Sequence, residues 1–133
     1  MIQFTSIVLS GVLERFPRLR IAFMESGAGW VPFIVDRLDR EFRNRGAGLK
    51  IPPGEHARSE RVFLHCELDE PMLPVAIDAV GDVHFFAASD FPHEPAHDFP
   101  EAVEAFLKRS DVSEASKTGI LADNPRRLYN LPP

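Results

Sequence analysis

Three short apolar runs in this sequence of 133 residues lead into acidic side chains. Glu25 follows residues 21–24, Glu67 follows residues 62–66, and Asp90 comes one serine after residues 84–88. His93 stands three positions beyond Asp90, across a proline. Carboxylates and imidazoles are the groups that enzymes use to hold metal ions and to transfer protons. These residues are therefore the first candidates for a functional site.

Helix-like segments separate the three runs, which predicts an α/β fold with parallel strands. We expect strands at 20–25, 61–67 and 84–88, because short apolar runs without alternation are typical of strands buried on both faces. Helices are expected at about 5–16, 31–42 and 71–79, with three more in the last third and the longest loop from 46 to 54. Right-handed crossovers bring the carboxyl ends of such strands to one rim, where Glu25, Glu67, Asp90 and His93 should gather.

The composition is that of a single globular domain spanning residues 1–133, with 44% hydrophobic and 26% charged residues. A net charge of −5 argues against a nucleic-acid partner. No apolar stretch reaches the roughly 18–20 residues of a membrane span, and the first residues lack the pattern of a secretory signal. The single cysteine, Cys66, permits no internal disulfide. We therefore expect a cytoplasmic protein without membrane contacts.

Four motifs stand in a fixed order along the chain: residues 16–32 (FPRLRIAFMESGAGWVP), 36–39 (DRLD), 88–93 (ASDFPH) and 124–129 (NPRRLY). Together they resemble the carboxyl-terminal half of the amidohydrolase-related family, which includes aminocarboxymuconate-semialdehyde decarboxylase-like enzymes and related aromatic-acid decarboxylases. The resemblance implies a metal-dependent hydrolase of the TIM-barrel type. This chain would then be a partial (β/α)₈ barrel of about three parallel strands with flanking helices.

The resemblance also implies roles for individual residues. Asp90 matches the eighth-strand aspartate that binds the family's mononuclear metal, usually zinc, and would also accept a proton. Glu25 falls at the end of the sixth strand, and His93 matches the histidine of the family's Ser-Asp-aromatic-Pro-His motif. Both would orient or protonate a small carboxylated substrate, which the enzyme hydrolyses or decarboxylates without oxidation.

The sequence departs from the family pattern in its histidines. It contains no His-x-His pair, and no histidine precedes Glu25, so we expect this chain to lack the first five strands and their ligands. Asp90 alone cannot hold zinc, which takes three protein ligands even in an open catalytic site. A divalent metal, zinc by the family pattern, is expected only where another chain completes the site.

Three strands cannot close a barrel, so we expect both sheet edges and the inner face to be exposed. Exposed apolar surface of this kind favours association. We expect a homodimer, or a second chain that carries the missing half of the barrel. The alternative is a non-catalytic, truncated or split-gene half-barrel that acts as an oligomerisation or partner subunit.

Each candidate residue also has a structural reading. Glu25 could form an ion pair with an arginine, Asp90 could cap a turn, and His93 could bond to the backbone. Glu67 and His65 lie on one side of their strand and could join Asp90 in a two- or three-ligand site, or be solvated rim residues.

Structural roles are favoured at the remaining positions. Cys66 alternates away from Glu67 and is expected to be a buried, inert thiol. Trp30 is expected in the core, and the arginines at 126–127 in a closing helix. His56 and His97 are expected in surface loops.

Overall fold

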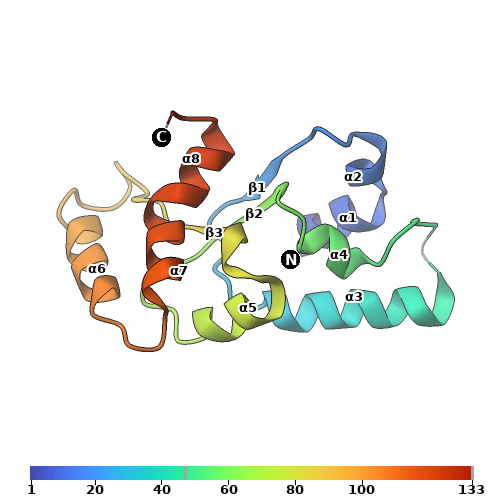
Figure 1. The fold of residues 1–133 in the computed structure, drawn as a ribbon, viewed down its shortest axis with the longest axis horizontal. Coiled ribbons are helices and arrows are strands. Elements are labelled where there is room, and N and C mark those ends of the chain that lie inside the picture. Colours follow the sequence, from blue (N-terminus) through green and yellow to red (C-terminus); the bar gives the residue numbers. More distant parts are fainter. Residues whose placement is uncertain (47, 133) are drawn as a thin grey trace.

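A computed structural model describes residues 1–46 and 48–132. At its centre lies a three-stranded parallel sheet in the order β1-β2-β3 (Figure 1). The strands are β1 (Ile21–Phe23), β2 (Val62–His65) and β3 (Phe85–Phe86). Ile21 is in register with Val62, and Leu64 with Phe85. The predicted fold, parallel strands with flanking helices, is confirmed, although each strand is shorter than expected.

Helices surround the sheet and account for most of the ordered backbone. In Figure 1, α3 and α5 run along one side of the sheet, and the last three helices lie at the end away from α1, α2 and α4. The helices are α1 (Ile2–Leu9), α2 (Val12–Arg15), α3 (Val31–Arg45), α4 (Pro53–Ala57), α5 (Leu73–Val80), the 3₁₀ turn η1 (Asp82–His84), α6 (Asp98–Leu107), α7 (Glu114–Thr118), the π-helical turn η2 (Gly119–Asp123) and α8 (Asn124–Tyr129). No helix in the described part of the chain is long and apolar enough to cross a membrane.

The main core lies between one face of the sheet and the helices that connect the strands. Every second strand residue points to this face, because successive side chains alternate across a strand. Leu64 and Phe85 are fully buried there and meet apolar residues of the preceding and crossover helices: Phe4, Val8, Val31, Val35, Leu73 and Ala76. Trp30 packs edge-to-face on Phe4 at 5.1 Å between ring centroids, as expected for a core residue. The helices therefore fix the strand ends that carry the candidate residues.

Two expected elements differ from the structure. The single helix predicted at about 5–16 is two helices, because Gly11 adopts a left-handed conformation with φ +70° and ends the first one. The loop predicted from 46 to 54 includes residue 47, which lies outside the described residues. Its last part is helical, since Pro53 and Gly54 begin α4 and the Gly54 amide donates to Asp39 Oδ1 at 2.6 Å.

The expectation of an exposed inner face was wrong. Phe63 and Phe86, on the face opposite the main core, are 0% and 1% exposed. The Arg127 guanidinium of α8 lies over the Phe63 ring at 5.3 Å. Asn124, which begins α8, donates to the Phe85 carbonyl at 2.7 Å and thereby occupies backbone at the β3 edge. The carboxyl-terminal helices thus cover surface that the strand pattern alone left open.

His56 was expected on the surface and is instead 2% exposed, within α4. Its Nε2 lies 3.2 Å from the Glu14 carboxylate, which also accepts a hydrogen bond from the Lys50 amide at 2.7 Å. This amide is the main reason that the pKa of Glu14 is lowered. The histidine is buried because it joins α4 to α2, and a sequence reading cannot see that long-range contact.

Candidate functional site

A pocket of about 620 Å³ lies at the carboxyl ends of the three strands. Glu25 comes to it from the end of β1, His65 and Glu67 from the end of β2, and Asp90 from the segment after β3. One face of α6, with Phe99, Ala102 and Ala105, forms an apolar side of the same pocket. The structure therefore brings three of the four residues expected at the rim, together with His65, around one cavity.

Glu25 and Asp90 share an unusual backbone conformation. Their φ angles are +52° and +50°, in the left-handed region that residues other than glycine rarely adopt. Such residues cost on the order of 1–3 kcal/mol each, and they cluster at functional sites. Asn130 also has a positive φ, but it ends α8, where this conformation is common. The side chains of Glu25 and Asp90 are thus held in place by a strained backbone conformation.

His93 lies apart from the other candidates. Its side chain is exposed and does not line the pocket, and its amide donates to the Asp90 carbonyl at 2.8 Å. The residue therefore helps to form the turn after Asp90. A role for its imidazole in chemistry stays a prediction.

His65 is more deeply buried than expected for a residue two positions before the exposed Glu67. It is 4% exposed, lines the pocket, and has no hydrogen-bond partner at either ring nitrogen. Its Nδ1 lies 3.7 Å from the Glu67 carboxylate, and its ring packs against Phe86 at 5.9 Å between centroids. The sequence signal was the i, i+2 spacing of His65 and Glu67, which is correct but does not reveal the burial.

Glu70 was not recognised from the sequence, although it supports the site. Its carboxylate accepts hydrogen bonds from the Ala28 amide at 2.8 and 2.9 Å, from Gly29 at 3.2 Å and from Glu67 at 3.0 Å. It therefore joins the turn after Glu25 to the turn that carries Glu67. The only sequence signal was a glycine-rich turn, whose free amides need an acceptor.

The pocket lining is strongly acidic. Four of its carboxylates follow the strand ends, at Glu25, Glu67, Asp69 and Asp90. Three more, those of Glu94, Asp98 and Glu101, come from the segment after β3 and from α6. Neither lysine nor arginine is among the described residues that line this pocket. Acidic groups therefore dominate the lining and favour a negative potential in the cavity. Arg109 does not line the pocket but donates to the Leu68 carbonyl at 2.8 Å and offsets part of this charge near Asp69.

Cys66 is a buried member of the core, as its alternation predicted. It is 1% exposed, and its S–H donates to the Phe86 carbonyl with Sγ 3.6 Å from the oxygen. Burial raises the pKa of the thiol, and the nearby Glu70 and Glu67 carboxylates add to the effect. A thiol that keeps its proton is a poor nucleophile and a poor metal ligand.

The described residues do not assemble a metal centre. Within residues 1–46 and 48–132, no group of three or more histidine, cysteine, aspartate or glutamate side chains has the arrangement needed to hold a metal ion. Asp90 is one candidate ligand, whereas a catalytic zinc takes three from the protein. The residues present do not fit a complete mononuclear metal site.

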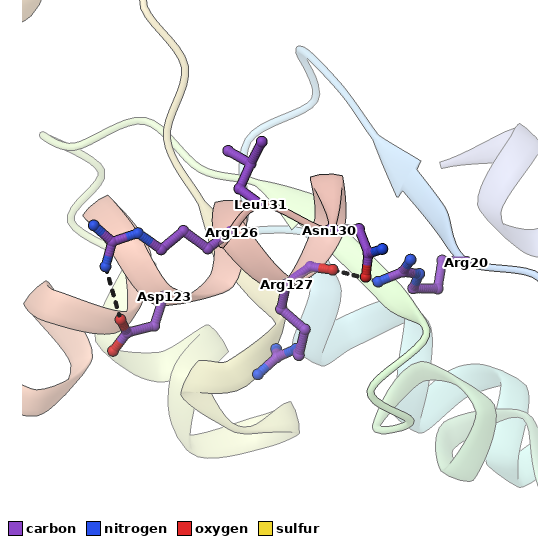
Figure 2. Close-up of a pocket in the computed structure, with 6 residues that line it drawn as sticks. All are labelled: Arg20, Asp123, Arg126, Arg127, Asn130 and Leu131. Carbon is purple, nitrogen blue, oxygen red and sulfur yellow. Dashed lines mark hydrogen bonds and ion pairs between the residues drawn. The ribbon is translucent and has the colours of Figure 1, made fainter. Parts of the chain in front are cut away.

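A second cavity of about 300 Å³ lies at the opposite end of the strands and contains three arginines (Figure 2). Their guanidinium groups are directed apart: Arg126 faces Asp123 at 3.9 Å, Arg127 donates to the Val83 carbonyl, and Arg20 donates to the Arg127 carbonyl. Groups that do not converge cannot bind one anion together. Arg20 and Arg127 join α8 to the segments that lead into β1 and β3, whereas Arg126 pairs locally with Asp123. These contacts agree with the structural role expected from the sequence.

Comparison with known proteins gives a family match over almost the whole chain. The family model described as amidohydrolase matches residues 1–131. A curated relative, the 2-amino-3-carboxymuconate-6-semialdehyde decarboxylase of Dictyostelium discoideum, is 25% identical over 134 aligned positions. That alignment covers 96% of this chain and 36% of the relative.

Solved structures show the same fold. The 5-carboxyvanillate decarboxylase of Sphingomonas paucimobilis matches with a TM-score of 0.74 and 25% identity, over 95% of this chain and 38% of its own. An amidohydrolase of Mycobacterium avium subsp. paratuberculosis K-10 matches with a TM-score of 0.79 and 26% identity, over 94% and 32%. A dihydroxybenzoic acid decarboxylase of Polaromonas sp. JS666, solved with manganese and 2-nitroresorcinol, has a TM-score of 0.75 at 21% identity, over 98% and 39%. The chain thus spans between about a third and two fifths of the length of these proteins.

Proposed function

Because the chain belongs to the amidohydrolase family, we propose that its acidic pocket is one wall of an active site that hydrolyses or decarboxylates a small carboxylated substrate. Decarboxylases are prominent among the proteins it resembles, which favours the non-oxidative loss of CO₂. The remaining wall would come from strands that this chain does not contain.

One observation carries this proposal: Glu25 and Asp90 line the same pocket, and both have left-handed backbone. Strain of this kind is retained where the position of a side chain matters more than the relaxation of its backbone. The two strained acids are also the residues that the family motifs single out. A purely structural pair of turn acids would not require both features.

Glu25 would act as the proton donor. When a C–CO₂⁻ bond breaks, CO₂ leaves and the carbon keeps the electron pair, so this carbon must then receive a proton. Glu25 follows the end of β1, lines the pocket and is exposed to solvent, which is a suitable position for a general acid. Asp90 would accept a proton or bind the substrate's polar groups.

A divalent metal, zinc by the family pattern, would require ligands from another chain in addition to Asp90. That partner would be a second copy or a separate chain that carries the missing strands. β1 is the sheet edge available for it, since β1 is hydrogen-bonded to β2 on one side and forms the end of the sheet on the other. A cytoplasmic location fits the single buried thiol.

The test combines assembly, metal content and turnover. Light scattering should show more than one copy, or a complex with a co-expressed partner, and metal analysis should find a divalent ion that the Asp90→Asn variant loses. Asp36→Asn, an exposed acid on α3, is the matched control and should keep the metal. The assembled protein should release CO₂ from a hydroxylated aromatic carboxylate. A monomer without metal or turnover would contradict the proposal.

A second candidate function rests on the incomplete metal site of the described residues. The chain would then be a non-catalytic subunit, a truncated or split-gene half-barrel that associates with a partner. The same experiments separate the two, because this candidate expects association without metal and without CO₂ release.

A further inference from the structure

The chemistry of the pocket lining selects the ligand group that it can receive. Seven carboxyl side chains line the cavity, whereas its described lining contains neither lysine nor arginine and few side-chain donors, Ser89 and His65 among them. A ligand carboxylate placed against this wall would meet mainly acidic groups. A group that donates hydrogen bonds and carries positive charge would be attracted by every one of these acids.

His65 is an independent sign that this wall binds a ligand. The residue is 4% exposed, yet neither ring nitrogen has a partner, and leaving such a group unpaired costs about 1–3 kcal/mol. The Glu67 carboxylate lies 3.7 Å from Nδ1, too far for a hydrogen bond. In the tautomer that carries its N–H on Nδ1, Nε2 is left to accept a hydrogen bond from a ligand.

The other histidines do not share this situation. His56 lies beside Glu14, and His84 bonds to the Val62 carbonyl. His93 is exposed outside the pocket, and His97 is exposed beside Asp98. His65 is therefore the histidine that both lines the pocket and lacks partners at both ring nitrogens.

The rest of the pocket suits a ring. Leu68, Phe99, Ala102 and Ala105 contribute apolar surface to the pocket, beside acidic groups that include Asp98 and Glu101 of α6. The volume of about 620 Å³ lies within the range of small-molecule pockets, about 300–1,000 Å³. This mixture of apolar surface and acceptors fits a molecule with an aromatic body and a cationic end.

We propose that the pocket binds a ring-bearing primary amine, with its ammonium group against Glu67 and His65 and its ring toward α6. This inference deepens the proposed function, on which it rests for the substrate's carboxylate. A substrate would place its amino end on this wall and its carboxylate on the wall supplied by the partner. The substrate class is then an aromatic carboxylate that also carries an amino group.

Benzylamine and benzoate form a matched pair of probes, since they share a ring and differ in the charge of the substituent. Each is titrated into the full chain while the ring resonances of the histidines are followed by NMR. Benzylamine should shift His65 saturably and bind at least about tenfold more tightly than benzoate, a difference of about 1.4 kcal/mol. The His65→Gln variant should bind benzylamine about fivefold more weakly, as expected for the loss of one hydrogen bond. Glu60→Gln, at an exposed acid that does not line the pocket, should bind as the parent does.

Three results would overturn the proposal: benzoate binding as tightly as benzylamine, no effect of His65→Gln, or Mn²⁺ shifting the His65 resonances while benzylamine does not. If His65→Gln fails to fold, Glu67→Gln replaces it and should also weaken benzylamine binding. Metal content, assembly and CO₂ release do not enter this experiment. A failure here therefore leaves the proposed function standing, and a failure of those assays leaves the amine site standing.

Discussion

Both oxygens of the Glu70 carboxylate accept a hydrogen bond from the backbone amide of Ala28, with N···O distances of 2.8 and 2.9 Å. This contact joins the turn that follows β1 to the turn that follows β2, and each turn carries one wall of the acidic pocket. The geometry of the pocket therefore depends on a residue that does not line it.

Replacing Glu70 by glutamine should destabilise the protein. Glutamine keeps the size of the side chain but loses the charge and one acceptor oxygen, while the amides of Ala28, Gly29 and Glu67 still need partners. A charge-assisted hydrogen bond contributes about 1.5–3 kcal/mol, so the free energy of unfolding should fall by roughly this amount. Urea denaturation measures it. Glu60→Gln, at an exposed acid in a turn, is the control and should change stability by less than about 0.5 kcal/mol.

Gly27→Ala tests the same contact from the opposite side. Gly27 has φ +61°, and a Cβ there would lie 2.6 Å from Glu70 Oε1, so the carboxylate would have to leave its hydrogen bonds with the Ala28 amide. The matched control is Gly11→Ala, at φ +70° and ψ +15°, where the added carbon would have only an ordinary contact, 3.5 Å from Leu49 Cδ2. Both variants bear a backbone penalty of about 1 kcal/mol for the positive φ.

The difference between the stability losses of the two glycine variants measures the contribution of the Glu70 contact alone. Gly27→Ala should lose about 1–2 kcal/mol more stability than Gly11→Ala in thermal or urea unfolding. Equal losses in the two variants would show that Glu70 can move without cost and that its hydrogen bonds do not hold the turn.

His84 should make the protein less stable as the pH falls below neutral. Burial lowers the pKa of His84, and the hydrogen bond between Nδ1 and the Val62 carbonyl at 3.1 Å opposes this only in part. In the unfolded chain His84 therefore binds a proton near pH 6.5, whereas in the folded chain it does so only at a lower pH. The free energy of unfolding should decline from about pH 6.5 down to the lower folded pKa.

The measurement is the melting temperature between pH 7.5 and 5. The parent should lose stability over this range, and His84→Gln should show a shallower decline. His97→Gln, at a side chain that is 74% exposed, should follow the parent. A decline of equal slope in His84→Gln would assign the effect to other groups.

The sequence predicted the parts of the fold that depend on local pattern and on motif order. The strands around Ala22, Leu64 and Phe86 were placed correctly because apolar runs between helices indicate parallel strands. The gathering of Glu25, Glu67 and Asp90 followed from strand direction, which any right-handed crossover imposes. These inferences needed no knowledge of contacts between distant residues.

Long-range contacts account for what the sequence did not predict. His56 is buried because Glu14, 42 positions away, lies beside it. The hydrogen bond between the Ala28 amide and the Glu70 carboxylate also spans 42 positions, and no periodic pattern in the sequence predicts it. The burial of His65 depends on the positions of α6 and of the segment that follows β3. The alternation of side chains along a strand does not determine these positions.

The coverage of the sheet by the last helices leads to the final prediction. Asn124 is 2% exposed and donates from Nδ2 to the carbonyls of Asp82 and Phe85, at 2.8 and 2.7 Å. Asn124→Asp keeps the shape but replaces this donor by a buried negative charge facing two carbonyl oxygens. Leaving a buried charge without a partner is strongly destabilising, by about 3–5 kcal/mol.

Asn44→Asp, at an exposed position of α3, is the control and should stay within about 0.5 kcal/mol of the parent. Hydrogen exchange at the β3 amides should accelerate in Asn124→Asp only. Unchanged protection there would show that α8 covers this edge without the help of the amide.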